Sequence, residues 1–185
     1  MPSPNNRFSR STFTPAFFQG ILIGMFLLGL ANGIQAQETC NSCSDCSTKL
    51  SNPGVQIMLT QDLGPIAGTC ITVNAQDVQL DCAGHTITGN DTGTGIVNHG
   101  FNNVTIRNCK ITHFDFGIDL QDLSGNTLLN NQITYLDLIG IYLLNANNNI
   151  LIQNTILYSS REGISIYNST GNRLEFNPTT IFKSK

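Results

Sequence analysis

Residues 117–120 read Gly-Ile-Asp-Leu, residues 140–143 read Gly-Ile-Tyr-Leu, and residues 163–166 read Gly-Ile-Ser-Ile. With an earlier pair at Gly95-Ile96, the Gly-Ile pairs recur at spacings of 22, 23 and 23 residues. Asparagines keep the same period, nine residues after the last three glycines (Asn126, Asn149, Asn172) and again five residues later (Asn131, Asn154, Asn177). Internal repetition of this length predicts a solenoid, in which each coil packs on its neighbours.

Apolar and polar residues alternate within each repeat. Ile141 and Leu143, for example, flank Tyr142. A period of two residues predicts strands with one buried face, and the Asn, Gly and Ser residues between the runs are typical of turns. The predicted fold is therefore all-β, a right-handed parallel β-helix of about five coils of 22–23 residues. Its inward column is expected to include Ile118, Ile141 and Ile164.

The later asparagine column is predicted to form an inward ladder whose amides bond from coil to coil, with members Asn131, Asn154 and Asn177. Each such hydrogen bond contributes about 1 kcal/mol net. A leucine-rich repeat has a similar length and is the rival architecture. Its pattern places an Asn soon after closely spaced leucines and often returns through a helix. Here the Asn comes well after the strand, and the return reads as a second strand and a turn, which favours the β-helix.

The first 36 residues have the order of a secretory signal peptide. Arg7 and Arg10 precede an apolar run at 20–31, and Ala36 ends a small-residue exit. A retained signal-anchor is the alternative, but the run is short for a membrane span, so we expect none in the mature protein. Cleavage after Ala36 leaves 149 residues, which suits one domain. We expect a Cys-rich N-terminal cap at 37–54, a β-helix domain at 55–185, and a secreted, periplasmic or cell-surface location.

The expected mature chain is mildly acidic. The signal segment contains two of the nine basic residues and none of the twelve acidic ones, so its removal changes the formal net charge from −3 to −5. This charge argues against nucleic acid or an anionic membrane as a partner.

All six cysteines lie in the expected mature chain: Cys40, Cys43, Cys46, Cys70, Cys82 and Cys109. An even number of cysteines in an exported protein predicts three disulfides. The alternative is a metal site at the cluster Cys40, Cys43 and Cys46. Structural zinc sites usually use two separated ligand pairs, and no His lies near this cluster, so disulfides are favoured and no cofactor is expected.

Several phrases of the chain resemble a known group of proteins. Residues 80–89 read Leu-Asp-Cys-Ala-Gly-His-Thr-Ile-Thr-Gly, residues 104–109 read Val-Thr-Ile-Arg-Asn-Cys, and the Gly-Ile and Asn-x-Leu-x-x-Asn repeats follow. From about Cys46 to Asn177 the chain resembles the parallel β-helix families of the pectin-lyase-like superfamily and is similar to their NosD-type domains. These phrases build coils, so the resemblance implies the fold and not one activity. Members of the superfamily include lyases, hydrolases, epimerases and a copper-enzyme accessory protein.

Positions in the resembled fold suggest a disulfide pairing. Cys82 and Cys109 occupy similar places in successive coils, and parallel strands about 4.8 Å apart suit a bridge. Cys46 and Cys70 flank the first, atypical coil and form the second expected bridge. Cys40 and Cys43 would remain as a local pair.

Enzymes with the resembled fold place carboxylates and a basic residue on the outer face of adjacent coils. The corresponding candidates are Asp115, Asp119, Asp137, Arg161 and Glu162. The set predicted to bind glycan is Asp115, Asp119, Asp137, Tyr142 and Arg161. Paired carboxylates suit Ca²⁺ or acid–base catalysis, whereas the alternative is an ordinary charged, solvated face. The Asp-Asp and Arg-x-Lys phrases of polygalacturonase-like enzymes and the Asp-Pro-His phrase of alginate epimerases are absent. We therefore assign no catalytic residue.

The sequence favours an exported, non-catalytic module that binds a polysaccharide or surface glycan or has a structural role. Coils of nearly constant length leave no long loops to wall a groove with several subsites. One alternative is a small polysaccharide lyase, hydrolase or epimerase acting on a uronate-type glycan. The other is a copper-enzyme accessory protein, although His85 lies in a coil-building phrase that favours a structural turn, and His99 and His113 have no partner at ligand spacing.

The repeat decays at the C-terminal end, where Pro178 follows the last ladder asparagine. A solenoid needs polar caps, so an open end predicts end-to-end self-association or membership of a longer assembly. The alternative is a lid formed by Phe176, Ile181 and Phe182.

Overall fold

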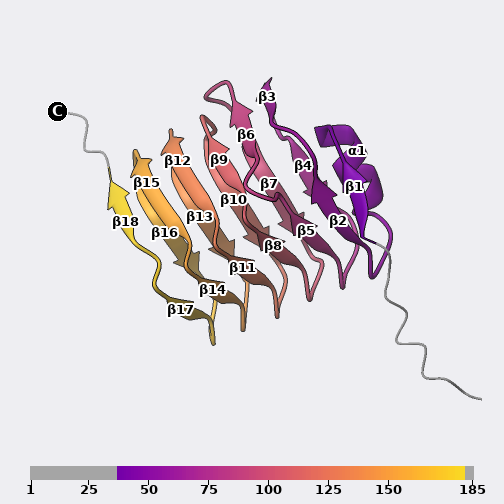
Figure 1. Ribbon diagram of the computed structural model, residues 1–185. Coiled ribbons are helices and arrows are strands. Elements are labelled where there is room, and N and C mark those ends of the chain that lie inside the picture. The colour runs from indigo at the N-terminus through magenta and orange to yellow at the C-terminus, as the bar shows by residue number, and fades with distance from the viewer. Residues whose placement is uncertain (1–36, 182–185) are drawn as a thin grey trace, which may run out of the picture. The chain divides into compact units, whose positions relative to one another are not determined.

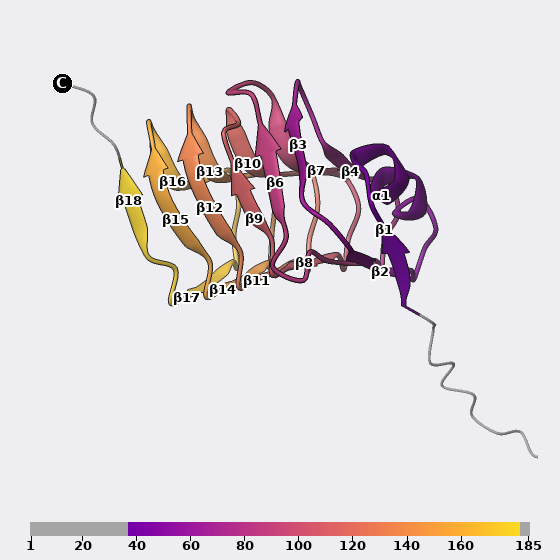
Figure 2. The same ribbon diagram turned by 45° about the horizontal axis from the view of Figure 1, so that its top comes forward.

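Each turn of the chain passes through three parallel β-sheets, and successive turns stack into a right-handed parallel β-helix (Figures 1 and 2). The computed structural model describes residues 37–181. The expected signal peptide and Phe182 lie outside this range. There are about six coils, against the five or so expected from the repeat.

The strands are short, and all strand pairings among the described residues are parallel. Sheet A contains β1 (Glu38–Cys40), β2 (Gln56–Leu59), β5 (Gln79–Asp81), β8 (Thr105–Arg107), β11 (Thr127–Leu129), β14 (Ile150–Ile152) and β17 (Arg173–Glu175). Sheet B contains β3 (Leu63–Ile66), β6 (Thr86–Gly89), β9 (Lys110–Thr112), β12 (Gln132–Leu136), β15 (Thr155–Ser159) and β18 (Thr179–Ile181). Sheet C contains β4 (Ile71–Val73), β7 (Thr94–His99), β10 (Phe116–Gln121), β13 (Ile139–Leu144) and β16 (Glu162–Tyr167).

One inward position of each sheet stacks in register through the coils and forms the core. In sheet C the column is Ile71, Ile96, Ile118, Ile141 and Ile164. Sheet A contributes Ile57, Leu80, Ile106, Leu128 and Leu151, and sheet B contributes Ile87, Ile111, Ile133 and Ile156. All of these side chains are buried except Ile164, which is half-buried in the last full coil. Each full burial contributes roughly 1.5–3 kcal/mol, so these columns dominate the stability of the fold.

The Gly-Ile pairs have a steric cause. A Cβ atom added to Gly117 would lie 2.5 Å from the carbonyl oxygen of Gly140 and 2.5 Å from Cγ2 of Ile133. Atoms cannot approach so closely, and the first of these obstacles is backbone. The glycine column therefore lets sheet C pack closely against the isoleucine column of sheet B.

Two asparagine columns line the turns on either side of sheet A. Asn131, Asn154 and Asn177 follow sheet A, and in this ladder the Oδ1 atom of each later residue accepts a hydrogen bond from the previous asparagine. The column that precedes sheet A, Asn126, Asn149 and Asn172, repeats the arrangement. The sequence showed the spacing of this second column, but a ladder was predicted only for the first.

A disulfide extends the ladder that follows sheet A toward the N-terminus. Cys82 and Cys109 are bonded, with their Cα atoms 4.7 Å apart, as expected for equivalent places in adjacent coils. The backbone N–H of Cys109 donates to Oδ1 of Asn131 at 3.0 Å. The bridge and the amides therefore occupy one column, and the described residues include no free cysteine.

The other two expected bridges are wrong. The structure pairs Cys40 with Cys46 and Cys43 with Cys70. The reason is the helix α1 (Cys43–Lys49), which the sequence reading did not foresee. The helix turns the buried Cys46 toward β1, where Cys40 lies, and brings Cys43 next to the turn before β4. The predicted bridge between Cys40 and Cys43 therefore does not form.

The N-terminal cap is part sheet and part helix. Strand β1 extends sheet A by pairing with β2, so the cap region already contributes a strand to the solenoid. Helix α1 starts at the N-cap Ser42 and covers the N-terminal end of the stack (Figure 2). The hydroxyl of Ser47 accepts a hydrogen bond from the backbone N–H of Thr72 at 3.0 Å, which satisfies a donor on the edge strand β4.

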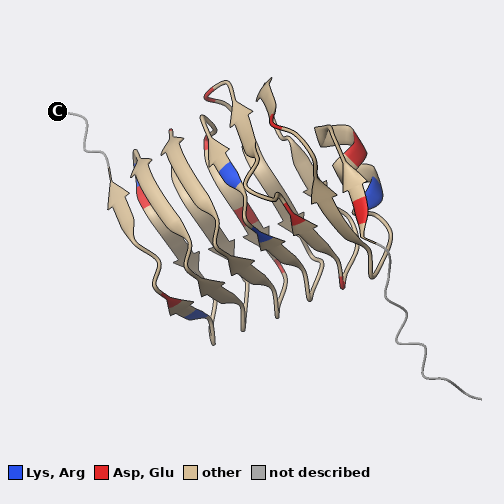
Figure 3. Ribbon diagram, viewed as in Figure 1, with Lys and Arg blue, Asp and Glu red and all other residues tan. Residues whose placement is uncertain are grey.

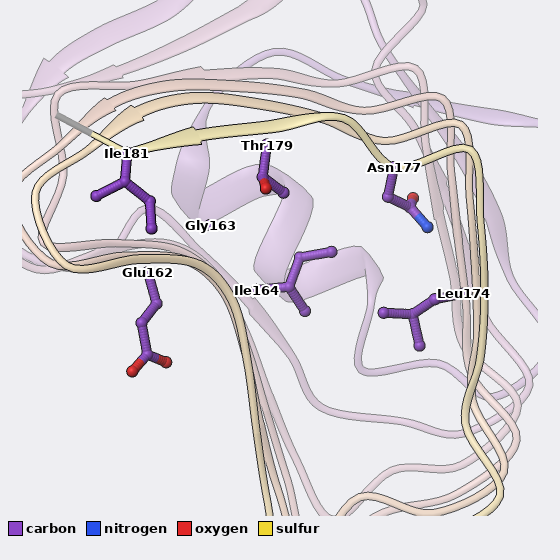
Figure 4. Close-up of a pocket in the computed structure, with 7 residues that line it drawn as sticks. All are labelled: Glu162, Gly163, Ile164, Leu174, Asn177, Thr179 and Ile181. Atoms are coloured by element: carbon purple, nitrogen blue, oxygen red, sulfur yellow. The ribbon is translucent and has the colours of Figure 1, made fainter.

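The opposite end of the described solenoid is open. A hollow of about 430 Å³ lies over the last coil, and Ile164, Leu174 and Thr179 point into it (Figure 4). Leu174 and Ile181 are 42% and 47% exposed, and Phe176 is 81% exposed, so neither Phe176 nor Ile181 closes the end as a lid. In this last coil the ladder asparagines have no following coil among the described residues.

Self-association through this end stays a prediction. We expect the apparent mass in sedimentation velocity to rise with protein concentration, because the end exposes unpaired strand edges and apolar side chains. Leu174→Glu should shift the equilibrium to monomer, whereas the distant, exposed Asn74→Asp should not. A strictly monomeric parent protein at high concentration would contradict the prediction.

Candidate functional site

An outward column of four residues lies at the C-terminal end of sheet B in successive coils, where each residue either comes after its strand or is the last but one residue of it. Its members are Asp91, His113, Tyr135 and Tyr158, and all have a left-handed backbone, with φ of 65°, 59°, 55° and 62°. The backbone N–H of Asp91 donates to the carbonyl of His113, and that of His113 donates to the carbonyl of Tyr135. These bonds keep the column in register.

The residue types in this column are unusual for their backbone. Most other left-handed positions of the coils are Asn or Asp, such as Asn108 and Asn130 or Asp122 and Asn145, which tolerate this conformation best, although Gln153 and Phe176 also adopt it. Aromatic side chains gain nothing locally from a left-handed backbone. What distinguishes this column is that three of its four members are rings in successive coils.

The three rings of the column stack along the solenoid axis. The centroids of His113 and Tyr135 are 5.6 Å apart with an interplanar angle of 20°, and those of Tyr135 and Tyr158 are 4.9 Å apart at 21°. Tyr135 is 53% exposed despite this stacking. The column therefore forms an aromatic strip on the outer surface, which we call the aromatic column.

A groove of about 410 Å³ runs beside the aromatic column. Besides the three rings, its lining consists of the buried Leu136, the hydroxyl residue Ser160, and the carboxylates Asp91 and Asp137. Both aspartates are exposed, and neither makes a side-chain hydrogen bond or ion pair within residues 37–181. An apolar strip with a few unengaged polar groups is the usual composition of a small-ligand site.

The residues expected to bind glycan do not form one site. Asp137 lines the groove. Asp115 does not; its carboxylate accepts a hydrogen bond from the backbone N–H of Gly93 at 2.8 Å and so stabilises the turn. Arg161 is exposed and does not line the groove.

Asp119 and Tyr142 lie together elsewhere, on the outer face of sheet C, where they are register partners on β10 and β13. Asp119 is only 8% exposed, and its carboxylate accepts hydrogen bonds from the side chain of Gln121. The same carboxylate lies 3.1 Å from Nε2 of His99. Tyr142 packs near Phe116. The predicted glycan-binding residues therefore lie on separate surfaces, and the prediction did not include the rings of the aromatic column.

In a third polar cluster, on sheet A, the charged and polar groups form an ion pair and hydrogen bonds with one another. The guanidinium of Arg107 lies 2.9 Å from the carboxylate of Asp81, which also accepts from Asn108 at 3.0 Å and from the N–H of Ala83 at 2.8 Å. Burial raises the pKa of Asp81, but these hydrogen bonds and the Arg107 charge hold it below its ordinary value. Its contribution to stability is therefore present above the ordinary pKa and is lost as the pH falls through the lowered one. This arrangement braces the fold and leaves no group free for a ligand.

The fold and the groove define a parallel β-helix with an outward aromatic column beside a groove. The chain belongs to the NosD family: the family model described as periplasmic copper-binding protein (NosD) matches residues 31–180. Structural disulfides are typical of oxidising compartments, and the three here, together with the family, indicate an extracytoplasmic location. No described helix is long and apolar enough to cross a membrane.

Two other comparisons add little to function. A solved structure titled as the catalytic domain of a GH87 α-1,3-glucanase in complex with nigerose is similar, with a TM-score of 0.45 and 18% identity over 80% of this chain. The match spans about a third, 34%, of that structure. No curated protein matches the chain.

The side chains present do not fit the copper centre that the family description implies. Copper in proteins is held by thiolate, thioether and imidazole groups. All six cysteines are in disulfides, and within the described part of the chain no three His, Cys, Asp or Glu side chains come together as a metal site. His85 and His99 each contact an aspartate, and His113 stacks on Tyr135.

Proposed function

We propose that the protein is a non-catalytic glycan-binding module of the periplasm or cell surface, and that the aromatic column is its binding surface. The observation that supports this proposal is the exposed stack of His113, Tyr135 and Tyr158 beside a groove with free carboxylates. Sugar rings present apolar C–H faces that pack on aromatic rings, and their hydroxyls donate hydrogen bonds to carboxylates. The groove volume lies within the usual range for such ligands.

The regular backbone beneath the column suits a binding surface. Rings from successive coils are held about one coil apart by the ladder of the solenoid, so the strip is rigid before any ligand arrives. Tyrosine provides a large contact area with few rotatable bonds, which lowers the entropy that binding must offset. A polymer with repeating rings matches a surface whose aromatic residues also repeat.

Removal of the most exposed ring tests the proposal. After a glycan-array screen identifies a bound oligosaccharide, Tyr135→Ala should weaken its binding at least tenfold in isothermal titration calorimetry. That factor corresponds to about 1.4 kcal/mol, within the range for one lost stacking contact. Product analysis of the same mixtures should detect no cleavage.

Phe176→Ala is the matched control. Phe176 is also an exposed aromatic residue with a left-handed backbone, but it lies outside the groove. Its removal should leave binding unchanged. Unchanged binding by Tyr135→Ala, or an equal loss in both variants, would contradict the aromatic column as the surface, and cleavage products would contradict the non-catalytic role.

A further inference from the structure

The charge of the groove restricts the class of glycan that it accepts. Asp91 lies at one end of the aromatic column, one coil before His113, and Asp137 follows Tyr135 by two residues in the same coil. None of the described residues that line the groove is Lys or Arg. Arg161 follows Ser160 in the chain but does not line it.

These two carboxylates differ from most others on the coils. Asp81 is paired with Arg107, Asp115 accepts a backbone N–H, and Asp119 accepts from Gln121. In contrast, Asp91 and Asp137 have no partner for their side chains among residues 37–181. Two unengaged carboxylates beside tyrosine rings favour a ligand that brings its own hydrogen-bond donors and positive charge.

The overall charge of the chain favours a cationic ligand as well. The expected mature chain after Ala36 contains seven basic and all twelve acidic residues, a formal net charge of −5. Charged residues are sparse over most of the coils, so few basic side chains offset this balance (Figure 3).

From these features, and resting on the proposed function, we infer that the glycan is an amino-sugar polymer with free amino groups. The apolar faces of its rings pack against the aromatic column, while its amines donate to Asp91 and Asp137 and carry positive charge when protonated. A uronate polymer would instead place its carboxylates next to these two aspartates. The groove therefore opposes the uronate-type glycan considered from sequence.

Three hexasaccharides of glucose-type units joined by β-1,4 bonds separate this inference from the proposed function. They carry a free amine, an N-acetyl group or a hydroxyl at carbon 2. We expect the free-amine hexamer to bind at least tenfold more tightly than the other two, and its binding to weaken with added salt. Asp137→Asn should reduce that preference at least threefold, because it weakens binding of the free-amine hexamer more than binding of the N-acetyl and hydroxyl hexamers.

Glu162→Gln is the charge control, since Glu162 is an exposed carboxylate that lies outside the groove, at the open end. It should leave the preference intact. Equal binding of the three hexamers, or Tyr135-dependent binding of only neutral or uronate glycans, overturns the amino-sugar inference while the proposed function stands. Absence of binding to any glycan overturns both.

Discussion

Ile141→Asp is expected to prevent the β-helix from folding. The Ile141 side chain is fully buried in the middle of the sheet C column, between Ile118 and Ile164. An aspartate there loses the packing of the isoleucine and buries a charge with no partner, which should cost more than about 5 kcal/mol. That cost is comparable with the total stability of many domains. Far-UV circular dichroism and limited proteolysis measure the loss directly.

A matched variant on the same strand separates burial from a general intolerance of charge. Ile139 is half-buried, and its register partner in the next coil is Glu162, so this column already accepts a carboxylate. Ile139→Glu should therefore fold and change stability by about 1 kcal/mol or less. A well-folded Ile141→Asp protein with unchanged melting would show that Ile141 does not face the interior.

Asn154→Ala is expected to have the next largest effect, a loss of roughly 3–5 kcal/mol. Asn154 is fully buried at the centre of its ladder. Its Oδ1 accepts from the backbone N–H of Asn131 at 3.2 Å, and its Nδ2 donates to the carbonyl of Leu128 at 2.9 Å and to Asn177 at 3.0 Å. Alanine removes all of these partners and leaves the buried backbone groups unsatisfied. Urea denaturation should show a clear fall in the midpoint.

The exposed Asn74 provides the control for this substitution. Its side chain makes one long hydrogen bond, to the carbonyl of Thr72 at 3.4 Å. Asn74→Ala should therefore change stability by less than about 0.5 kcal/mol. If the two variants unfolded at the same urea concentration, the ladder would not be the stabilising element that its hydrogen bonds indicate.

The architecture could be predicted because a solenoid repeats one burial requirement in every coil. Ile118, Ile141 and Ile164 face the same interior, so the same kind of residue recurs at the same spacing. The glycines before them recur because each Cβ would meet the next coil. Asn131 and Asn154 recur because an inward amide can satisfy the backbone of the coil beside it. Each requirement acts on equivalent positions and is therefore visible as a period.

The cap does not repeat, and there the sequence reading was least accurate. The bridge between Cys82 and Cys109 joins similar places in successive coils, as expected. Cys43 and Cys46 instead lie on a helix of seven residues, Cys43–Lys49, whose packing on β1 and β4 selects their partners. Connectivity in a non-repeating segment depends on contacts between elements, which spacing along the chain does not encode.

The candidate site illustrates the same division. The spacings from His113 to Tyr135 and on to Tyr158 are 22 and 23 residues, so the aromatic column was present in the sequence as a period. Its meaning depends on the left-handed backbone at those positions and on the outward direction of the rings, which only the folded coils establish. Asp115 and Asp119 had the expected chemistry, but the folded coils engage both with neighbouring groups.

By itself, the sequence determined the number of residues in a coil, the inward face of each strand and the presence of a ladder, because burial and backbone hydrogen bonding constrain every repeat in the same way. The tertiary structure decided which cysteines meet and which outward side chains share a surface. Outward residues are not constrained by the core, so their grouping depends on turn geometry and on the stacking of neighbouring coils.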